Sequence, residues 1–338
     1  MITILGGGIA GVTLARALAV RGRDVVVFDP HPPATGSTGR AAGGFRTQFT
    51  SDLNIALAMA SRPFFVERAE HIRFQSVGYL FMAEDPVTAR ELERRAEIQV
   101  AAWLPITHPD PAALAPFLDT SRVIATNFCH LDGTFSPVAL LDLLIEEARE
   151  AGAEFRYSCE AGPQDLVAEI VVIASGSWSR QVGASLGVEL AVEAMERGVF
   201  QVVPGITLPD SVPFIIDAAN GWSMRERDGR LLILPPGDAS NWEETRAWLE
   251  RSIPAASIDQ PEDHWTGSYE MSFDQQPLIG ETSRAGVWSC CGFSGHGMIQ
   301  APSVAESLAA MILGQTPPLD ISAFSPQRTE PLVEITQV

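Results

Sequence analysis

The sequence predicts an α/β chain, α+β overall, in which a Rossmann-like domain with a parallel sheet is interrupted by a second domain with a mostly antiparallel sheet. Residues 2–29 read as strand, glycine-rich turn, helix and strand, and residues 170–174 form the apolar run of a buried parallel strand. Residues 199–270 contain short strand-like runs and one helical stretch, which predicts the second sheet.

The N-terminal segment carries a dinucleotide-binding pattern. The apolar run Ile2–Leu5 leads into the letters GGGIAG, a helix-spaced apolar series and a second strand that closes at Asp29. This is the G-x-G-x-x-G fingerprint with an acid about 20 residues further on. Gly6 permits the tight turn, Gly8 lets the backbone approach a pyrophosphate and Gly11 lets the helix pack on the strand. Asp29 is expected to accept hydrogen bonds from an adenosine ribose.

A second glycine-rich segment, Gly292–Gly297, lies near the other end of the chain. Its letters GFSGHG precede the apolar run Met298–Leu313, which is typical of a helix. The N-terminus of a helix carries roughly half a positive charge and unpaired backbone N–H groups. We therefore expect this loop to stabilise an anion, or a ring that gathers negative charge.

Between these segments the pattern alternates between helices and strands. Helices are expected over 53–70, 86–102 and 138–151, a strand over 78–82, and a loop over 105–116. No internal repeat is present.

Composition restricts the class of protein. The 338 residues suffice for two domains, and a net charge of -19 argues against nucleic acid or an anionic membrane as a partner. No apolar run approaches the ~20 residues of a membrane span, and the first strand begins at residue 2, so we expect a cytoplasmic protein. The four cysteines lack metal-binding spacing and are expected to be reduced thiols, without a metal site.

All 23 residues counted as Lys+Arg are arginine. The absence of lysine excludes a Schiff base formed by lysine, a lysine base, and a lysine ammonium near a cofactor.

The chain resembles the D-amino-acid oxidase-like (DAO) family of FAD-dependent oxidoreductases, especially its sarcosine oxidase, glycine oxidase and proline dehydrogenase branch. The motifs that carry the resemblance occur in family order over nearly the whole chain: Gly6–Asp29, Gly36–Phe49, Asp132–Pro137, Ala174–Ser179, Trp265–Gly267, Asp274–Gly280 and Gly292–Gly297.

The resemblance implies an enzyme that moves a hydride from the α carbon of an amine to flavin N5 and produces an imine. Arg46 matches the arginine that binds the substrate carboxylate, and a guanidinium forms bidentate pairs with such groups. Tyr269 matches a tyrosine on the substrate side, Gln48 would add a hydrogen bond, and His296 would donate to the flavin or line the substrate pocket.

The remaining cofactor contacts are expected along the same motifs. The expected FAD-binding residues are Gly6, Gly8, Ile9, Ala10, Gly11, Asp29, Pro30, Ser37, Arg40, Gly43, Gly44, Ala174, Gly176, Trp178, Gly267, Gly292, Gly295, His296, Gly297 and Met298. By the same resemblance, residues 1–75, 132–188 and 271–330 form the FAD-binding domain, residues 76–131 and 189–270 the substrate-binding domain, and residues 331–338 a tail.

Departures from the family pattern carry further expectations. Gly267 stands where some sarcosine oxidases attach FAD through cysteine, and the stretch Gly36–Arg40 lacks the histidine that others use, so FAD should be non-covalent. Ile299 replaces a second carboxylate-binding lysine, which leaves Arg46 alone, or else Arg225 or Arg230, as the anchor. The lysine that promotes oxygen reduction is also missing, which favours a dehydrogenase.

Several alternatives stay open at this point. The electron acceptor is oxygen or a redox partner, and the protein is an oligomer, part of a hetero-complex or neither. The segment 155–168 is shorter than the usual adenine-covering hairpin, so that side of the site should be more open. The chain could also be a 2-hydroxy-acid oxidoreductase on the same scaffold, a non-catalytic flavin-binding subunit or a nicotinamide-dependent Rossmann enzyme.

Overall fold

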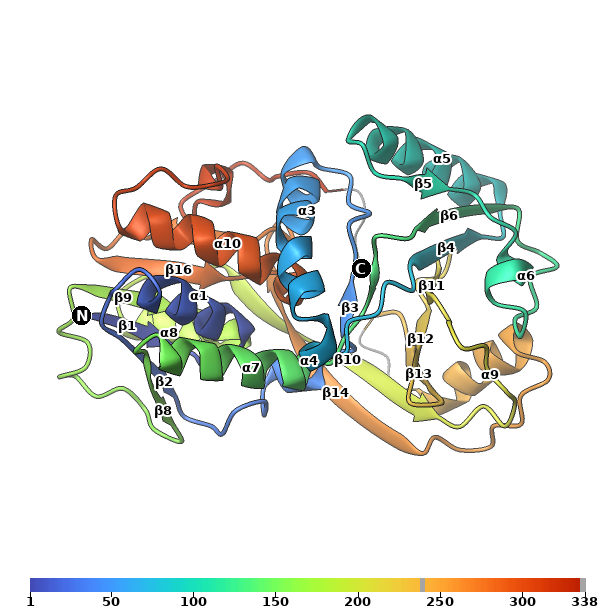
Figure 1. Ribbon diagram of the computed structural model, residues 1–338, viewed down its shortest axis with the longest axis horizontal. Coiled ribbons are helices and arrows are strands. Elements are labelled where there is room, and N and C mark those ends of the chain that lie inside the picture. Colours follow the sequence, from blue (N-terminus) through green and yellow to red (C-terminus); the bar gives the residue numbers. More distant parts are fainter. Residues whose placement is uncertain (238–240, 335–338) are drawn as a thin grey trace.

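The computed structural model describes residues 1–237 and 241–334, which form two lobes (Figure 1). One lobe is built on a six-stranded sheet and the other on an eight-stranded sheet. Helix α3 (Asp52–Glu67) and the C-terminal end of the described chain lie where the two lobes meet.

The six-stranded sheet has the order β15-β16-β9-β1-β2-β8 and is parallel except for β15, which pairs antiparallel with β16. The buried β1 pairs in register with both neighbours, Ile2 lying opposite Val25 and Ile170. The strands are β1 (Ile2–Leu5), β2 (Val25–Asp29), β8 (Glu154–Tyr157), β9 (Ile170–Ile173), β15 (Leu278–Glu281) and β16 (Val287–Cys291). The parallel, Rossmann-like part of the predicted fold class is thereby confirmed.

Three helices pack together against this sheet (Figure 1). They are α1 (Ile9–Ala19), α7 (Pro137–Glu150) and α10 (Gly297–Ile312). The Ser136 hydroxyl caps the start of helix α7 by accepting from the Ala139 N–H at 3.3 Å, and Pro137 lies in the first turn. Its apolar side buries Leu140, Leu141 and Leu144, and these helices thereby fix the glycine turns that precede α1 and α10.

The eight-stranded sheet has the order β14-β10-β13-β12-β11-β4-β6-β5 and is antiparallel apart from the parallel pair β11 and β4. This matches the predicted mostly antiparallel sheet. The strands are β4 (Tyr79–Ala83), β5 (Ile106–Thr107), β6 (Ala125–Cys129), β10 (Val192–Val202), β11 (Phe214–Asp217), β12 (Ser223–Arg227), β13 (Arg230–Leu234) and β14 (Asp263–Ser272).

The shorter elements connect or cover these sheets. They are α2 (Ser37–Arg40), α4 (Ala69–Ile72), α5 (Pro86–Ala101), α6 (Pro111–Leu114), α8 (Ser179–Ser185), α9 (Trp242–Ser252), two short helical turns at Gly176–Trp178 and Ser322–Phe324, and the pair β3 (Gly44–Phe45) with β7 (Gly133–Thr134). The helix expected over 53–70 is two helices, α3 and α4, because the backbone leaves helical geometry at Arg68. The loop expected over 105–116 contains β5 and α6.

The strands β10 and β14 are long and run from one lobe into the other (Figure 1). Their register, Val192 with Ser272 through Gln201 with Asp263, is continuous over ten residue pairs. Strand β14 carries Tyr269 beside the loop that precedes α10, because a Cβ on Gly295 would lie 2.6 Å from the Tyr269 ring. The end of β14 thus joins the second sheet to the glycine-rich loop of the first lobe.

The division of the chain into discontinuous domains at the boundaries given above stays a proposal. One feature of the proposed tail is structural: Glu334 is 6% exposed, and its carboxylate lies at the start of α3. Residues 335–338 of the tail, and 238–240 of the proposed substrate domain, lie outside the described residues.

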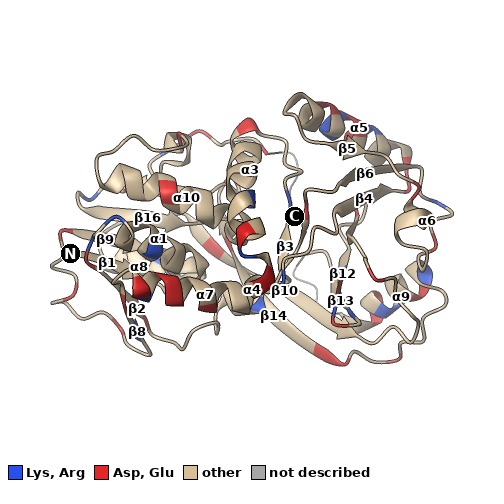
Figure 2. Cartoon of the chain, viewed as in Figure 1, with Lys and Arg blue, Asp and Glu red and all other residues tan. Residues whose placement is uncertain are grey.

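Acidic residues occur on the helices of both lobes, including α5, α7 and α10 (Figure 2). Among the described residues, no helix combines the length and apolar character needed to cross a membrane.

Candidate cofactor and substrate site

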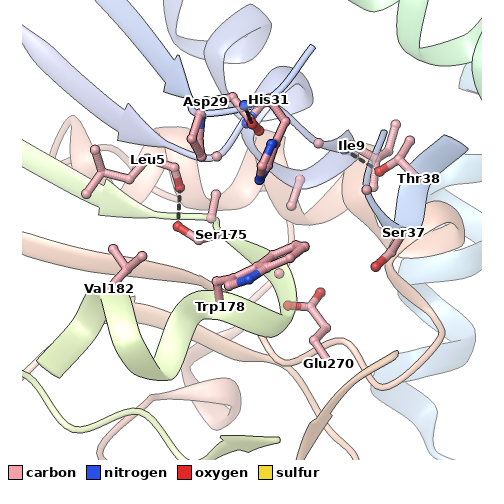
Figure 3. A pocket seen from close by; sticks show the side chains of 18 of the residues that line it. Leu5, Ile9, Asp29, His31, Ser37, Thr38, Ser175, Trp178, Val182 and Glu270 are labelled. Carbon is pink, nitrogen blue, oxygen red and sulfur yellow. Dashed lines mark hydrogen bonds between the residues drawn. The ribbon is translucent and has the colours of Figure 1, made fainter. Parts of the chain in front are cut away.

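A cavity of about 640 Å³ opens along the carboxyl ends of β1, β2 and β9 (Figure 3). Glycines and small residues form much of its wall, including the turn between β1 and α1 and the loop before α10. Its charged side chains in the described part of the chain are carboxylates, Asp29, Glu160 and Glu270, and no arginine lines it. The cavity therefore extends from the glycine turn after β1 to the glycine-rich loop before α10.

The turn between β1 and α1 has no room for side chains. Gly6 has φ +117°, and a Cβ there would lie 2.2 Å from the Ala174 carbonyl oxygen. A Cβ on Gly11 would lie 2.0 Å from the carbonyl oxygen of Gly6. Both positions require glycine because another backbone passes too closely. The turn is consequently open toward the cavity, as a pyrophosphate site needs.

Asp29 fixes this turn from the end of β2. One of its carboxylate oxygens accepts from the Gly7 N–H at 2.8 Å and the other from the His31 N–H at 2.9 Å. The carboxylate lies at the cavity wall (Figure 3). Each oxygen has two lone pairs, so Asp29 retains acceptor capacity for a ribose hydroxyl.

Thr38 is a part of the turn that sequence reasoning missed. Its hydroxyl accepts from the Ile9 N–H at 3.0 Å and so satisfies one backbone donor at the start of α1 (Figure 3). A Cβ on Gly8 would lie 3.2 Å from this hydroxyl, which makes Gly8 part of the same close contact. The short helix α2 therefore closes over the fingerprint turn.

The loop before α10 forms the opposite end of the cavity. Gly295 has φ +90°, and its Cα faces the Tyr269 ring. Helix α10 begins at Gly297, directly after His296, so its positive end faces this part of the wall. Tyr269, Gly295, Gly297 and Met298 all line the cavity. The wall can thus stabilise negative charge there.

Arg46 and His296 meet behind this loop. The Arg46 Nη2 atom lies 3.0 Å from His296 Nε2, and both residues are buried. Phe49 supports the pair, with its ring edge-on to His296 at 5.1 Å and under the guanidinium at 4.7 Å. Burial lowers the pKa of Arg46, and burial together with the Arg46 charge lowers the pKa of His296 to about 3.

Gln48 faces Asp132 rather than the cavity. Its amide nitrogen donates to Asp132 Oδ2 at 2.8 Å and to the Tyr79 carbonyl at 3.1 Å. Thr47 donates to Asp132 Oδ1 from both its backbone N–H and its hydroxyl, each at 2.6 Å. Burial raises the pKa of Asp132 to about 6, although these hydrogen bonds oppose the shift. This network holds the segment that follows β3 and carries Arg46.

The structure brings many of the expected site residues to one cavity. Those that line it are Gly6, Gly8, Ile9, Ala10, Asp29, Pro30, Ser37, Ala174, Gly176, Trp178, Tyr269, Gly295, Gly297 and Met298. Those outside its lining are Gly11, Arg40, Gly43, Gly44, Arg46, Gln48, Gly267, Gly292 and His296.

Several of the expected residues outside the lining pack close behind it. Arg40 donates to the Thr266 carbonyl at 3.0 Å, and a Cβ on Gly267 would lie 3.3 Å from the Arg40 Cβ. A Cβ on Gly44 would lie 1.7 Å from the Tyr79 hydroxyl. Arg225, named as a possible second anchor, donates to the carbonyls of Ala42 and Gly43, each at 2.7 Å. These contacts position the segment around Gly43. The guanidinium of Arg225 is hydrogen-bonded to backbone carbonyls and does not line the cavity.

Glu270 is a second residue that sequence reasoning missed. It lies on β14 next to Tyr269, lines the cavity and accepts from the Gly292 N–H at 2.9 Å. An acid near the end of a strand ordinarily indicates a solvent-facing position. The place of Glu270 in the cavity wall becomes visible only from the contact of β14 with the glycine loop.

The residues present fit an FAD molecule. The glycine cradle, the Asp29 carboxylate and the loop at a helix N-terminus lie along one continuous cavity. The family model for FAD dependent oxidoreductases, designated DAO, matches residues 1–311.

Known proteins that resemble the chain include both dehydrogenases and oxidases. Mitochondrial dimethylglycine dehydrogenase of Mus musculus is 27% identical over 96% of this chain, which spans only 44% of that relative. Glycine oxidase of Geobacillus kaustophilus is 25% identical, and the match covers 96% of each chain. The crystal structure of L-proline dehydrogenase from P. horikoshii has a TM-score of 0.86 at 26% identity, covering 97% of this chain and 96% of that one.

Proposed function

The chain belongs to the DAO family of FAD-dependent oxidoreductases, and we propose that it oxidises the C–N bond of a small amino acid or N-substituted amino acid. The observation that carries the proposal is the position of the buried Arg46–His296 pair directly behind the loop that ends the FAD-sized cavity. The relatives described above, whose names specify dimethylglycine, glycine and proline, support an amino-acid substrate.

FAD, when bound, accepts the hydride equivalent that leaves the α carbon of the substrate. Gly6, Gly8 and the start of α1 would hold its pyrophosphate, and Asp29 would hold its ribose. The loop at Gly295 and Gly297, with the positive end of α10, stabilises the charge gained on reduction. The chain has no lysine to supply a cation there.

Arg46 is proposed to bind the carboxylate of the substrate. The aromatic face of Phe49 and the acceptor nitrogen of His296 fix its guanidinium in one orientation. Tyr269 is proposed to form the wall on the substrate side, since it lines the cavity beside Gly295. Gln48 is assigned a positioning role, because its amide holds Asp132 and not the cavity.

The cofactor is proposed to be bound without a covalent bond. Gly267 offers no nucleophile, and the stretch Gly36–Arg40 contains no histidine. Within it, the Thr38 hydroxyl accepts from the Ile9 N–H. Acid precipitation should release all flavin into the supernatant. Yellow colour retained in the washed protein pellet would contradict this assignment.

The electron acceptor is proposed to be other than oxygen, because the chain lacks the lysine associated with oxygen reduction in the oxidase branch. The second candidate function is oxidation of a 2-hydroxy acid, since the same arginine would bind its carboxylate. The family membership, and the continuity of the cavity between the two glycine-rich segments, support neither the non-catalytic subunit nor a nicotinamide-dependent enzyme.

The proposal is tested by mixing the purified FAD-loaded protein with candidate substrates without oxygen. We expect N-methyl or cyclic amino acids to bleach the flavin absorbance, and primary amino acids to do so more slowly. Bleaching by 2-hydroxy acids alone would favour the second candidate. Admission of air should restore the absorbance slowly, and rapid recovery would show that the protein is an oxidase.

A further inference from the structure

Glu270 is a carboxyl group that the reaction described above does not use. It lies on β14 and lines the cavity at the end formed by the glycine loop. Figure 3 shows its carboxylate pointing into the cavity, toward the indole of Trp178. The side chain is half-buried because one side faces the cavity and the other faces protein.

The hydrogen bonds of Glu270 join it to the loop that must also meet the charge of the reduced cofactor. Its Oε2 atom accepts from the Gly292 N–H at 2.9 Å, and its own carbonyl accepts from the Ser294 N–H at 3.1 Å. The negative charge of an ionised Glu270 therefore offsets part of the positive electrostatic potential of the loop. Negative charge arriving on a cofactor in the same cavity would repel it.

The groups that face Glu270 do not supply a compensating cation. Strand β16 contributes Cys290 and Cys291, whose pKa values burial and the Glu270 charge both raise, so they stay neutral thiols. Strand β10 contributes Glu193, Glu196 and Arg197, and the guanidinium of Arg197 lies over the Tyr269 ring at 5.4 Å.

The remaining neighbours of β14 are α2 and the turn at Gly176–Trp178. Helix α2 contributes Arg40, which is bound to the Thr266 carbonyl, and the turn contributes no charged side chain. Among the described residues no arginine or histidine forms an ion pair with Glu270.

We propose that Glu270 takes up a proton when the flavin is reduced and releases it when the flavin is reoxidised. Solvent supplies the proton that Glu270 takes up, so protons and electrons balance. Two electrons and one proton entering the cofactor add one negative charge to the cavity, and one further proton from solvent converts the Glu270 carboxylate to a carboxylic acid. Reoxidation removes the two electrons and one proton from the cofactor, and Glu270 returns its own proton to solvent.

The position of Glu270 sets the conditions for this exchange. Burial raises its pKa to about 7, while the Gly292 and Phe293 N–H groups oppose the shift. The group is thus close to half-protonated near neutral pH before reduction, and added negative charge nearby raises its proton affinity further. The inference concerns the cofactor and not the substrate, so it holds for an amine or a hydroxy acid.

The test is the midpoint potential of the bound flavin as a function of pH, measured with a chemical reductant. For a two-electron couple that takes up one proton, a tenfold change in proton concentration shifts the midpoint potential by about 30 mV. The wild-type slope should therefore be steeper than that of Glu270→Gln by up to about 30 mV per pH unit above pH 7. At pH 8 the variant should also have the higher potential, because its side chain stays neutral.

A matched control is Glu160→Gln, which changes an exposed carboxylate in the wall of the same cavity. Its slope should equal that of the wild type. Identical slopes for wild type and Glu270→Gln would overturn the proposal, even with a substrate reaction intact. Equally, failure of every amine to react would leave this measurement unaffected.

A measurement on the wild type alone guards against a variant that does not fold. The infrared difference spectrum between reduced and oxidised protein at pH 8 should contain a new carboxylic-acid C=O band. Glutamate labelled at its side-chain carboxyl should shift that band. A spectrum without any glutamate band on reduction would overturn the proposal.

Discussion

Arg46 and His296 are 250 residues apart in the sequence, and their side chains form a hydrogen bond of 3.0 Å between Nη2 and Nε2. A guanidinium has donors and no acceptor, so the histidine nitrogen must accept. His296 is therefore neutral, with its proton on Nδ1, and Nδ1–H is left as the donor of the ring. This assigns His296 the role of a neutral donor rather than a cation.

The first prediction concerns the titration of His296. Because burial and Arg46 lower its pKa to about 3, its ring resonances should not shift between pH 5 and pH 8 in an NMR titration of labelled histidine. In Arg46→Gln the positive charge is gone, and the pKa of His296 should rise. A wild-type titration near the ordinary value of 6.5 would show that the ring is protonated and that the hydrogen bond is absent.

The second prediction concerns the substrate carboxylate. Removing one partner of a buried charge pair costs at least about 2 kcal/mol, so Arg46→Ala should lower kcat/KM for carboxylate substrates by about 30-fold or more. Amine substrates without a carboxylate should lose much less. Arg180→Ala, at an exposed ion pair with Glu193, should react as the wild type does. Unchanged affinity of Arg46→Ala for carboxylates would remove Arg46 from this role.

The third prediction concerns Glu334. Its carboxylate accepts from the N–H groups of Thr50 at 2.7 Å and Ser51 at 3.0 Å and from the Asn54 amide at 2.9 Å. Hydrogen bonds to a charged group contribute about 1.5–3 kcal/mol, so Glu334→Ala should lower the free energy of unfolding in urea by about 2 kcal/mol. Glu330→Ala, an exposed glutamate in the same segment, should leave it nearly unchanged. Equal stability of the two variants would show that Glu334 does not anchor the segment.

The fourth prediction concerns Asp132. Burial raises its pKa from 3.8 to about 6, so the native state binds this proton more tightly than the unfolded state. The stabilisation is complete below pH 4 and is lost as the pH rises to about 6, a loss of about 3 kcal/mol for two pKa units.

Asp132→Asn removes this dependence. Its free energy of unfolding relative to wild type should thus increase by about 3 kcal/mol between pH 4 and pH 7. Asp142→Asn, which changes an exposed residue of α7, serves as the control. A difference between Asp132→Asn and wild type that does not vary with pH would contradict the buried carboxyl as described.

The fingerprint turn could be predicted because its determinants are local. Gly6 and Gly11 lie in one six-residue pattern, and a Cβ on Gly11 would meet Gly6 itself. The pattern is visible without the Ala174 carbonyl that a Cβ on Gly6 would meet. The fold class followed from the same kind of signal, since strand and helix periods are visible in short windows. The loop before α10 was recognisable for the same reason.

The rest of the site depends on contacts between distant segments. The Arg46–His296 hydrogen bond arises only when the α10 loop meets the segment around Arg46, and the contact of Gly292 with Glu270 only when that loop meets β14. Glu334 was read as part of a tail from its position, yet it binds residues 280 to 284 positions away. Gln48 shows the reverse case, because it was expected beside the substrate and its amide instead donates to Asp132.

Cleavage of the substrate α C–H bond is proposed to deliver its electrons to the flavin. It is tested most directly by anaerobic stopped-flow reduction of the FAD-loaded protein with an N-methyl amino acid and its α-deuterated form. We predict that the flavin is reduced by both and that deuterium slows the reduction several-fold. Lack of reduction by any amine, together with reduction by a 2-hydroxy acid, would contradict the account.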